Sequence, residues 1–304
     1  MPEALKEDRI VTSHELQEEF KNLPKQKGYS SGFKSLDRYL SEFREGDLTI
    51  ITGLTGEGKT QFAVSLTKKL LTAGITPLWF SFEISSQELF ERFGSELPLF
   101  YLPRLLTSKA GDWIEKKIEE AKAKEPGLKA IFIDHLHYLT DDTSVRNRQL
   151  PEILGNLCRQ FKMLARKHRL LIFLLAHTRK VRGNNTRPTI DDLKDSSGIA
   201  QEADTVLIIQ RVGKRRSKKA DDDEIPELSS NMKIWIDKNR RTGKLGVVEM
   251  YFDSTDMMHK EFFDDDIEAV KPSLDAKAPE TPVTKTDRKA AIEKIKKERK
   301  GSLL

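Results

Sequence analysis

The chain has 304 residues, of which 37% are hydrophobic and 33% are charged, enough for one large domain with appendages. Its longest apolar runs, such as residues 170–176, are far shorter than the ~20 residues that span a bilayer, which argues against a membrane protein. The single cysteine, Cys158, excludes intramolecular disulfides and cysteine-rich zinc modules. We therefore expect a soluble, intracellular protein.

The net charge of +5 at pH 7 is concentrated at the carboxyl end of the chain. Residues 271–304 hold ten Lys or Arg and five Asp or Glu, so the rest of the chain is formally neutral. A basic protein often binds nucleic acid, but here the excess charge lies in a segment with few large apolar residues. This composition predicts a disordered basic tail over residues 266–304, in which 287–300 could form a helix.

Residues 1–30 are predicted to lead into the folded domain, which we expect over residues 31–265. Ser13 belongs to the residue types that cap helix starts, so a short helix is predicted from Ser13 to Phe20. The following sequence KNLPKQKGYSSG is typical of a linker.

Inside the domain, short apolar runs alternate with longer amphipathic segments. The apolar runs predict buried strands at 48–52, 78–81, 130–134, 170–176 and 205–210. The amphipathic segments predict helices at 60–73, 86–94, 112–124 and 147–167. This alternation predicts an α/β fold with a mostly parallel central sheet and helices on both of its faces.

The carboxyl-terminal part of the domain has a different pattern. Two further strands, 233–237 and 247–252, flank the sequence RRTGKLG and predict a β-hairpin. The charged stretch 213–230 precedes this hairpin and is expected to be a surface insertion.

Residues 53–60 read GLTGEGKT and match the phosphate-binding pattern G-x-x-x-x-G-K-T. They lie between a predicted strand and a predicted helix, which is the context that phosphate binding requires. Backbone N–H groups can turn toward phosphate oxygens there, while Lys59 reaches the terminal phosphates and Thr60 ligates Mg²⁺. We therefore predict ATP and Mg²⁺ as cofactors. The predicted nucleotide-binding residues are Gly53, Thr55, Gly56, Glu57, Gly58, Lys59, Thr60 and Gln61.

Two carboxylates follow predicted strands. Asp134 ends the run KAIFID, where a carboxylate would emerge beside the phosphates and hold Mg²⁺. Glu83 follows the run WFSF, 24 positions after Lys59, and could polarise the attacking water as a general base. Each also has a structural interpretation: Asp134 could be a turn or cap residue, and Glu83 could stabilise the start of a helix.

Three histidines lie near the same strand ends. His135 and His137 form an H-x-H pair that can indicate zinc, but two more ligands at suitable spacing are missing. We expect packing and polar contacts there rather than a metal site. His177 ends the run LLAH and should point to the edge of the sheet where ligands collect, although a structural role is possible.

With these positions assembled, the chain resembles the helicase domain of the hexameric replicative family that includes DnaB, the phage primase-helicases and mitochondrial Twinkle. Five blocks in family order support this: GLTGEGKT, LWFSFEISSQEL, AIFIDHLHYL, LIFLLAHTRK…RPTIDDLKDSSGIAQEADTVLIIQR and KIWIDKNRRTGKLGVVEMYFD. The fourth is the most specific, because D-L-(K/R)-(D/E)-S followed by Q-(E/D)-A-D is hard to find elsewhere. LAHTRK is closer to the Twinkle and phage branch, with His177 where DnaB carries Gln.

The resemblance implies a RecA-like core that assembles as a homohexameric ring with ATP at the subunit interfaces. It makes Glu83 the catalytic base, Asp134 the Mg²⁺ carboxylate and His177 the sensor of the γ-phosphate. Lys238 and Arg240 correspond to the family's K-x-R pair, which acts on the neighbour's ATP with Arg240 as the arginine finger. Considered without the resemblance, KNRR fits a solvated hairpin equally well.

The resemblance also implies a path for DNA. Lys194, Asp195 and Ser197 correspond to the family's loop that tracks single-stranded DNA, although DnaB-like members have Gly at the position of Ser197. The loop 178–188, with the sequence RKVRGNNTRP, is basic as a phosphate-tracking loop should be, or is merely solvated. The 30 leading residues are too short for a DnaB-type N-terminal domain or a primase domain, but 13–22 could be the helix that packs onto the adjacent subunit.

The implied activity is that of an ATP-dependent DNA helicase in replication, translocating on single-stranded DNA as a ring. Its implied partners are forked DNA, further copies of itself and primase or other replisome proteins, with no membrane. The alternative is a RecA-like regulatory or recombination ATPase of the KaiC or RadA kind, since GFKSLDRYL before the first strand occurs in those relatives too. A third class is a binding module that uses ATP only as a switch.

Overall fold

A computed structural model of the chain describes residues 9–21, 26–107, 111–139, 150–178, 189–192, 197–212 and 232–261. The predicted tail at 266–304, the predicted insertion at 213–230 and residues 179–188 of the predicted basic loop lie outside these ranges. Among the described helices, none combines the length and the apolar character needed to cross a membrane.

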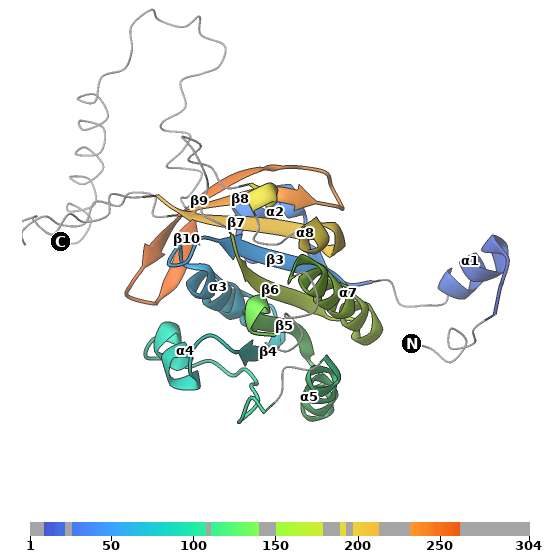
Figure 1. The fold of residues 1–304 in the computed structure, drawn as a ribbon, viewed down its shortest axis with the longest axis horizontal. Coiled ribbons are helices and arrows are strands. Elements are labelled where there is room, and N and C mark those ends of the chain that lie inside the picture. Colours follow the sequence, from blue (N-terminus) through green and yellow to red (C-terminus); the bar gives the residue numbers. More distant parts are fainter. Residues whose placement is uncertain are drawn as a thin grey trace, which may run out of the picture. The chain divides into compact units, whose positions relative to one another are not determined.

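The centre of the fold is an eight-stranded sheet in the order β10-β9-β8-β7-β3-β6-β5-β4 (Figure 1). Its parallel part consists of β3 (Leu48–Gly53), β4 (Thr76–Ser81), β5 (Leu128–Asp134), β6 (Leu171–His177) and β7 (Thr205–Arg211). The antiparallel part consists of β8 (Met232–Asn239), β9 (Gly246–Asp253) and β10 (Met258–Glu261). The predicted α/β fold with a mostly parallel sheet and a β8–β9 hairpin is confirmed.

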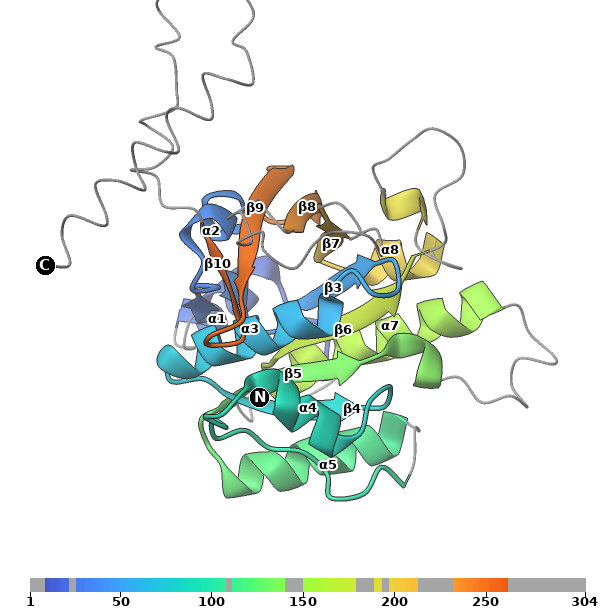
Figure 2. The same ribbon diagram turned by 90° about the vertical axis from the view of Figure 1, so that its left-hand side faces the viewer.

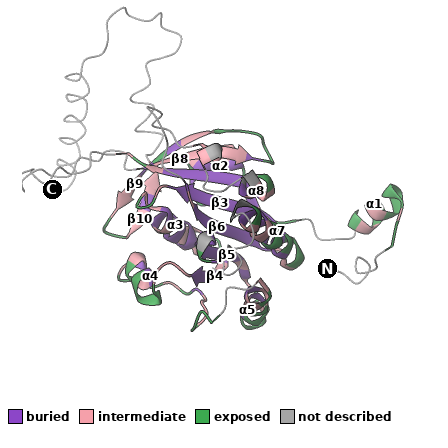
Figure 3. Ribbon diagram, in the orientation of Figure 1, coloured by how far each residue is buried: buried purple, intermediate pink, exposed green. Residues whose placement is uncertain are grey.

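The parallel strands read as continuous apolar runs because helices cover both faces of the sheet. On β6, Leu171, Phe173 and Leu175 face the apolar cluster that contains residues of α3 (Lys59–Thr72) and α4 (Ser86–Phe93). The intervening Ile172, Leu174 and Ala176 face the cluster that contains residues of α5 (Gly111–Lys124) and α7 (Leu150–His168). Figure 2 gives a second view of these layers, and Figure 3 shows the buried strands between them.

The predicted strands and helices of the core are all present, with ends that differ by a few residues. Elements that the sequence analysis did not predict are short. They are β1 (Gly28–Tyr29), α2 (Lys34–Leu40), β2 (Phe43–Arg44), the 3₁₀ turns η2 (Leu136–Leu139) and η3 (Ile190–Asp192), α8 (Ser197–Glu202) and β10.

The amino-terminal helix α1 (Ser13–Lys21) is present, but its predicted cap is wrong. Thr12, not Ser13, caps the helix: the Thr12 hydroxyl accepts the Glu15 N–H at 3.2 Å, and the Glu15 carboxylate accepts the Thr12 N–H at 2.8 Å. This reciprocal pair is a capping box, in which Ser13 is the first helical residue. No residue of α1 is buried.

His259 on β10 couples the stability of the fold to pH. Its ring is buried beside α3, where Nδ1 lies 3.1 Å from the Ser65 hydroxyl, and burial lowers its pKa from 6.5 to about 4. Between these pH values the unfolded chain holds a proton on His259 that the folded chain does not. The free energy of unfolding should therefore fall by ~1.4 kcal/mol per pH unit as the pH drops from 6.5 to 4, about 3 kcal/mol in all.

A His259→Gln variant should lose this contribution, since its side chain cannot take up a proton. Denaturant unfolding of both proteins between pH 7 and pH 4 measures the two slopes. His14→Gln is the matched control because His14 is an exposed histidine on α1, and its slope should equal that of the unchanged protein. Equal slopes for the His259→Gln and unchanged proteins would contradict the assignment.

Candidate active site

The segment between β3 and α3 has the backbone of a phosphate-binding loop. Gly53 ends β3 so close to β7 that a Cβ atom there would lie 2.3 Å from the Ile209 carbonyl oxygen. Gly58 directly precedes α3 with φ +93°, a left-handed conformation that side chains disfavour. Glycine is therefore required at both positions, and the N-terminus of α3 is free of any side chain that would cap it.

Lys59 lies inside this loop rather than in solvent. Its ammonium donates to the carbonyl oxygens of Gly53 at 3.1 Å and Leu54 at 3.0 Å. Burial lowers the pKa of Lys59, while the Glu83 and Asp134 carboxylates oppose that shift. The ammonium is thus held where the end of a phosphate chain would meet the loop.

The other predicted loop residues divide into two groups. Thr55 stays at the site, since its hydroxyl lies 3.5 Å from Nδ1 of His177, and Gly56 has open space beside its Cα. Glu57 and Gln61 turn away. The Glu57 carboxylate accepts the Arg211 N–H at the end of β7.

Gln61 corrects the sequence analysis, which placed it among the nucleotide-binding residues. Its side-chain amide donates to the carbonyl oxygens of Arg92 at 3.1 Å and Met257 at 2.9 Å. The side chain therefore fastens α3 to the end of α4 and to the turn between β9 and β10.

Thr60 and Asp134 meet at the end of β5, as predicted. The Thr60 hydroxyl donates to Asp134 Oδ2 at 2.7 Å, and Asp134 is fully buried. Burial and the neighbouring Glu83 carboxylate raise the pKa of Asp134 to about 6. The other oxygen, Oδ1, has no hydrogen-bond partner among the residues that the structure describes. A buried carboxylate oxygen in this state is costly unless it is paired, so the pair fits Mg²⁺, whose ligands are oxygens.

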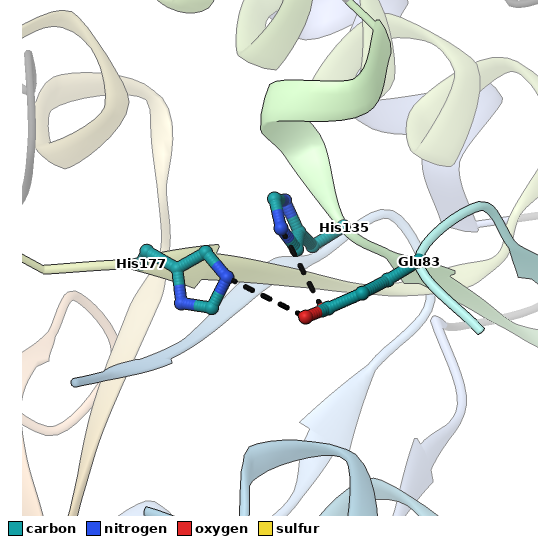
Figure 4. A group of neighbouring side chains, drawn as sticks. All are labelled: Glu83, His135 and His177. Atoms are coloured by element: carbon teal, nitrogen blue, oxygen red, sulfur yellow. Dashed lines mark ion pairs between the residues drawn. The ribbon is translucent and has the colours of Figure 1, made fainter. Parts of the chain in front are cut away.

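Glu83, His135 and His177 converge at the same edge of the sheet (Figure 4). Glu83 Oε2 lies 3.6 Å from His135 Nε2, and Oε1 lies 3.8 Å from His177 Nε2. Strand pairing produces this arrangement, since His177 is paired with Gly53 and the Glu83 N–H donates to the Asp134 carbonyl. The imidazole of His177, followed by His135 and Lys59, holds the pKa of Glu83 at about 2. Glu83 is therefore ionised and oriented, as a general base requires.

His135 makes the packing contacts that the sequence analysis expected. It is buried, and its ring lies 4.8 Å from Tyr138 and 4.2 Å from His177 between centroids. The side chain of His137 lies outside the described part of the chain.

Lys238 and Arg240 lie at the opposite edge of the sheet. Asn239 is paired with Thr205 on β7, and Thr205 is paired with Thr49 near the start of β3. Thr49 precedes Gly53 by four residues, which is roughly 13 Å of strand. The two cations point to one face, as predicted, because both donate to the Gln201 carbonyl, Lys238 at 3.2 Å and Arg240 at 2.8 Å.

A buried ion network supports Arg240, and the sequence analysis missed it. Asp204 Oδ1 accepts from Arg240 at 3.3 Å, and Oδ2 accepts from the Leu48 N–H at 2.8 Å and from the Lys162 ammonium. The motif Q-E-A-D contains this aspartate, but nothing in the pattern of α7 marks Lys162 as buried. The network borders a cavity of about 330 Å³ lined by Gln26, Glu45, Gly46, Asp47, Lys162, Arg166, Asp204, Arg240 and Arg241.

The predicted DNA contacts are not among the described features. Lys194 and Asp195 lie outside the described residues, and Ser197 begins α8 with a side chain that is also outside them.

This geometry agrees with a comparison of the whole sequence. The sequence model of the DnaB-like helicase C terminal domain matches residues 28–98 and 104–261. The chain belongs to the DnaB-like helicase family. The resemblance stated from the five sequence blocks is thereby confirmed.

Several curated DnaB-like relatives are similar along much of this chain. A probable replicative DNA helicase of Trieres chinensis is 25% identical over 269 residues, which cover 78% of this chain and 57% of that protein. The replicative DNA helicases DnaB of Helicobacter pylori strain J99 and Geobacillus stearothermophilus are 26% identical over 238 residues and 27% identical over 258 residues. These matches cover 68% and 74% of this chain, and 48% and 54% of those proteins. The chain thus spans about half the length of these relatives.

Two solved structures share the fold. A DnaB-like replicative helicase, studied together with its interactions with primase, superposes with a TM-score of 0.63 at 19% identity, covering 83% of this chain and 67% of that one. An isolated helicase ATPase domain gives a TM-score of 0.65 at 20% identity, covering 82% of this chain and 97% of that one. The predicted RecA-like fold is confirmed.

In this DnaB-like domain, Glu83→Gln should leave nucleotide binding intact and slow ATP hydrolysis by ~10²-fold or more. The amide keeps the shape of the side chain but cannot accept a proton from water. Binding of a fluorescent nucleotide and steady-state phosphate release measure the two effects. Glu88→Gln is the control, because that carboxylate serves only the capping box of α4 and its loss should not change turnover. Normal hydrolysis by Glu83→Gln would assign the base elsewhere.

Proposed function

We propose that the chain is the motor of a replicative DNA helicase, which hydrolyses ATP and translocates on single-stranded DNA as a homohexameric ring. The observation that carries this proposal is the separation of two half-sites. The phosphate-binding loop lies at one edge of the sheet, and Arg240 lies at the other. The replicative helicases among the relatives support the choice of DNA as the substrate.

In the proposed reaction, the loop amides and Lys59 bind the phosphates of ATP, and Thr60 and Asp134 hold Mg²⁺. Mg²⁺ held there neutralises charge that develops on the terminal phosphates. Glu83 takes a proton from the attacking water. His177 contacts Glu83 on one side and Thr55 on the other, which suits a sensor of the γ-phosphate.

Arg240 completes the site of a neighbouring subunit in this proposal. About 13 Å of β3 separates it from the loop of its own subunit, and its guanidinium is already oriented by Asp204 and the Gln201 carbonyl. An arginine has five N–H donors, so these contacts leave donors for a neighbour's phosphate. Lys238 lies beside Arg240 and adds a second positive charge to the same face.

Lys194, Asp195, Ser197 and the basic loop 178–188 are the proposed DNA contacts. Helix α1 exposes more than half of the Phe20 side chain, and we place it against the adjacent subunit of the ring. A similar DnaB-like helicase has been studied with primase, so primase and other replisome proteins are the candidate partners. A DNA substrate places the protein inside the cell.

The proposal is tested first by measuring ATPase rates with and without single-stranded DNA, and then strand displacement on a forked duplex. DNA-stimulated hydrolysis with displacement is the expected result. Hydrolysis without displacement would instead favour a regulatory or recombination ATPase. Nucleotide binding without turnover would favour a switch module.

Mixed subunits test whether the site is shared. Arg240→Ala should bind ATP but hydrolyse it slowly, since an arginine finger is worth ~10³–10⁵ in turnover. Lys59→Ala should be nearly inactive because the charge on the transferring phosphoryl group loses its compensation. In mixed rings, an intact loop from one variant can meet an intact Arg240 from the other. Part of the DNA-stimulated ATPase should return, while unwinding, which needs several sites in turn, should stay poor.

The control mixes Lys59→Ala with the double variant Lys59→Ala/Arg240→Ala, which cannot form a complete site and should recover nothing. Crosslinking of differently tagged subunits establishes that the rings are mixed. If such rings of Lys59→Ala and Arg240→Ala recover no activity, Arg240 acts within its own subunit or only as a partner of Asp204, and the shared site is abandoned.

The DNA loop is tested through salt dependence. Lys194→Ala should weaken binding of single-stranded DNA and reduce the slope of log affinity against log salt by about 1, because one phosphate contact is lost. Basal ATPase without DNA should persist. Lys124→Ala, which removes an exposed lysine of α5, is the control with an unchanged slope. Deletion of 271–304 should lower nonspecific affinity only; a collapsed slope there, with an unchanged slope for Lys194→Ala, would move the DNA site to the tail.

A further inference from the structure

Two imidazoles and one carboxylate at the edge of the sheet meet in the manner of metal ligands. The ligand atoms of Glu83, His135 and His177 all lie within 4.8 Å of one another (Figure 4). The sequence analysis considered zinc at His135 and rejected it because no further ligands stood at suitable spacing. The missing ligands come instead from the residues that follow β4 and end β6, far away in the sequence.

The distances are close to those of a metal site. Zinc binds imidazole nitrogen and carboxylate oxygen at ~2.0–2.2 Å, so tetrahedral ligands are roughly 3.4 Å apart. The carboxylate of Glu83 lies 3.6 Å from His135 Nε2 and 3.8 Å from His177 Nε2. A few tenths of an ångström of side-chain movement would bring both nitrogens to bonding distance. Three protein ligands with an open fourth position are the usual set of a zinc site that exchanges water or substrate.

The surroundings suit a cation that prefers nitrogen ligands. Nδ1 of His177 lies 3.5 Å from the Thr55 hydroxyl, and such a contact orients the other nitrogen, Nε2, toward a metal. Glu83 is ionised, and the buried Asp134 carboxylate lies nearby, so two acids face the single charge of Lys59. Mg²⁺ takes oxygen ligands, whereas imidazole selects Zn²⁺ and its transition-metal neighbours.

We propose that the nucleotide-free chain binds one divalent transition-metal ion of the Zn²⁺ or Co²⁺ class at Glu83, His135 and His177. The site is separate in its ligands from the Thr60–Asp134 pair proposed for Mg²⁺. A bound ion occupies the carboxylate that the proposed reaction uses as its base. Micromolar Zn²⁺ should therefore inhibit hydrolysis even when Mg²⁺ is saturating. Only this inhibition, and not the binding, rests on the proposed function.

Binding is measured on the full chain without nucleotide or DNA, by calorimetric titration with Zn²⁺ and by the visible absorption of Co²⁺. One ion per chain is expected, with a Co²⁺ spectrum typical of four-coordinate nitrogen and oxygen ligands. His177→Asn and Glu83→Gln should each weaken Zn²⁺ binding by at least ~10-fold, since even the loss of a residue that only supports a ligand costs that much. Both side chains are only partly buried, so these variants are expected to fold.

A second cluster in the described part of the chain supplies the matched control. Glu115, Glu119 and His168 also group together, but the Glu115 carboxylate is already paired with Lys167 at 2.8 Å and with His168 at 2.8 Å. His168→Asn should therefore leave Zn²⁺ affinity and basal hydrolysis unchanged. Loss of binding in His168→Asn with retention in His177→Asn would overturn the proposal, as would the absence of any stoichiometric Zn²⁺ binding.

The inhibition arm separates the metal site from the proposed reaction. Zn²⁺ should slow ATP hydrolysis by the unchanged protein, and a zinc-selective chelator should restore it with Mg²⁺ still present. Binding that depends on His177 without any inhibition would overturn the claim that the ion occupies the catalytic carboxylate. A chain that proved inactive on ATP would refute the proposed function and leave the binding result standing.

Discussion

The parallel pairing of β3 with β6 and β7 is the constraint on which the rest of the structure depends. It sends the carboxyl ends of the strands to one edge, where Gly53 is paired with His177. Asp134 and Glu83 reach the same edge from β5 and β4. The chain then reverses at β8, and antiparallel pairing with β7 returns Arg240 to the opposite edge. Strand direction alone thus divides the catalytic residues between two faces, which a ring of subunits can bring together.

Asp204 links those two faces through the buried interior. Its carboxylate holds the first N–H of β3, the Lys162 ammonium of α7 and the Arg240 guanidinium, and its own carbonyl accepts the Arg240 N–H. Buried charges are costly to desolvate, so each depends on the others, and removal of one partner typically costs ~3–5 kcal/mol. Helix α8 joins this network through the Gln201 carbonyl. That helix begins at Ser197, a proposed DNA contact, so only a few residues separate the proposed finger from the proposed DNA loop.

The prediction succeeded where structure follows from local pattern. Apolar runs identified the strands because a sheet covered on both faces buries every residue, and the glycine loop was identified because its backbone requires glycine. It failed where the deciding partner is distant. Helix α2 has no side-chain cap of its own, and its Ser35 N–H donates instead to Glu261, 226 residues away. Gln61 lies in a recognisable motif, yet its partners Arg92 and Met257 come from other elements.

The histidines show the same limit in chemical terms. Spacing rules count ligands along the chain and so reject a metal at His135, whereas strand order gathers ligands across the sheet and brings Glu83 and His177 to it. The edge then holds two sets of cation ligands, oxygens at Thr60 and Asp134 and nitrogens at the histidines. Mg²⁺ needs more oxygens than the protein supplies, and the phosphates of ATP provide them. Without phosphates the imidazole set is the better ligand for a transition metal. Nucleotide occupancy would therefore decide which cation this edge of the sheet prefers.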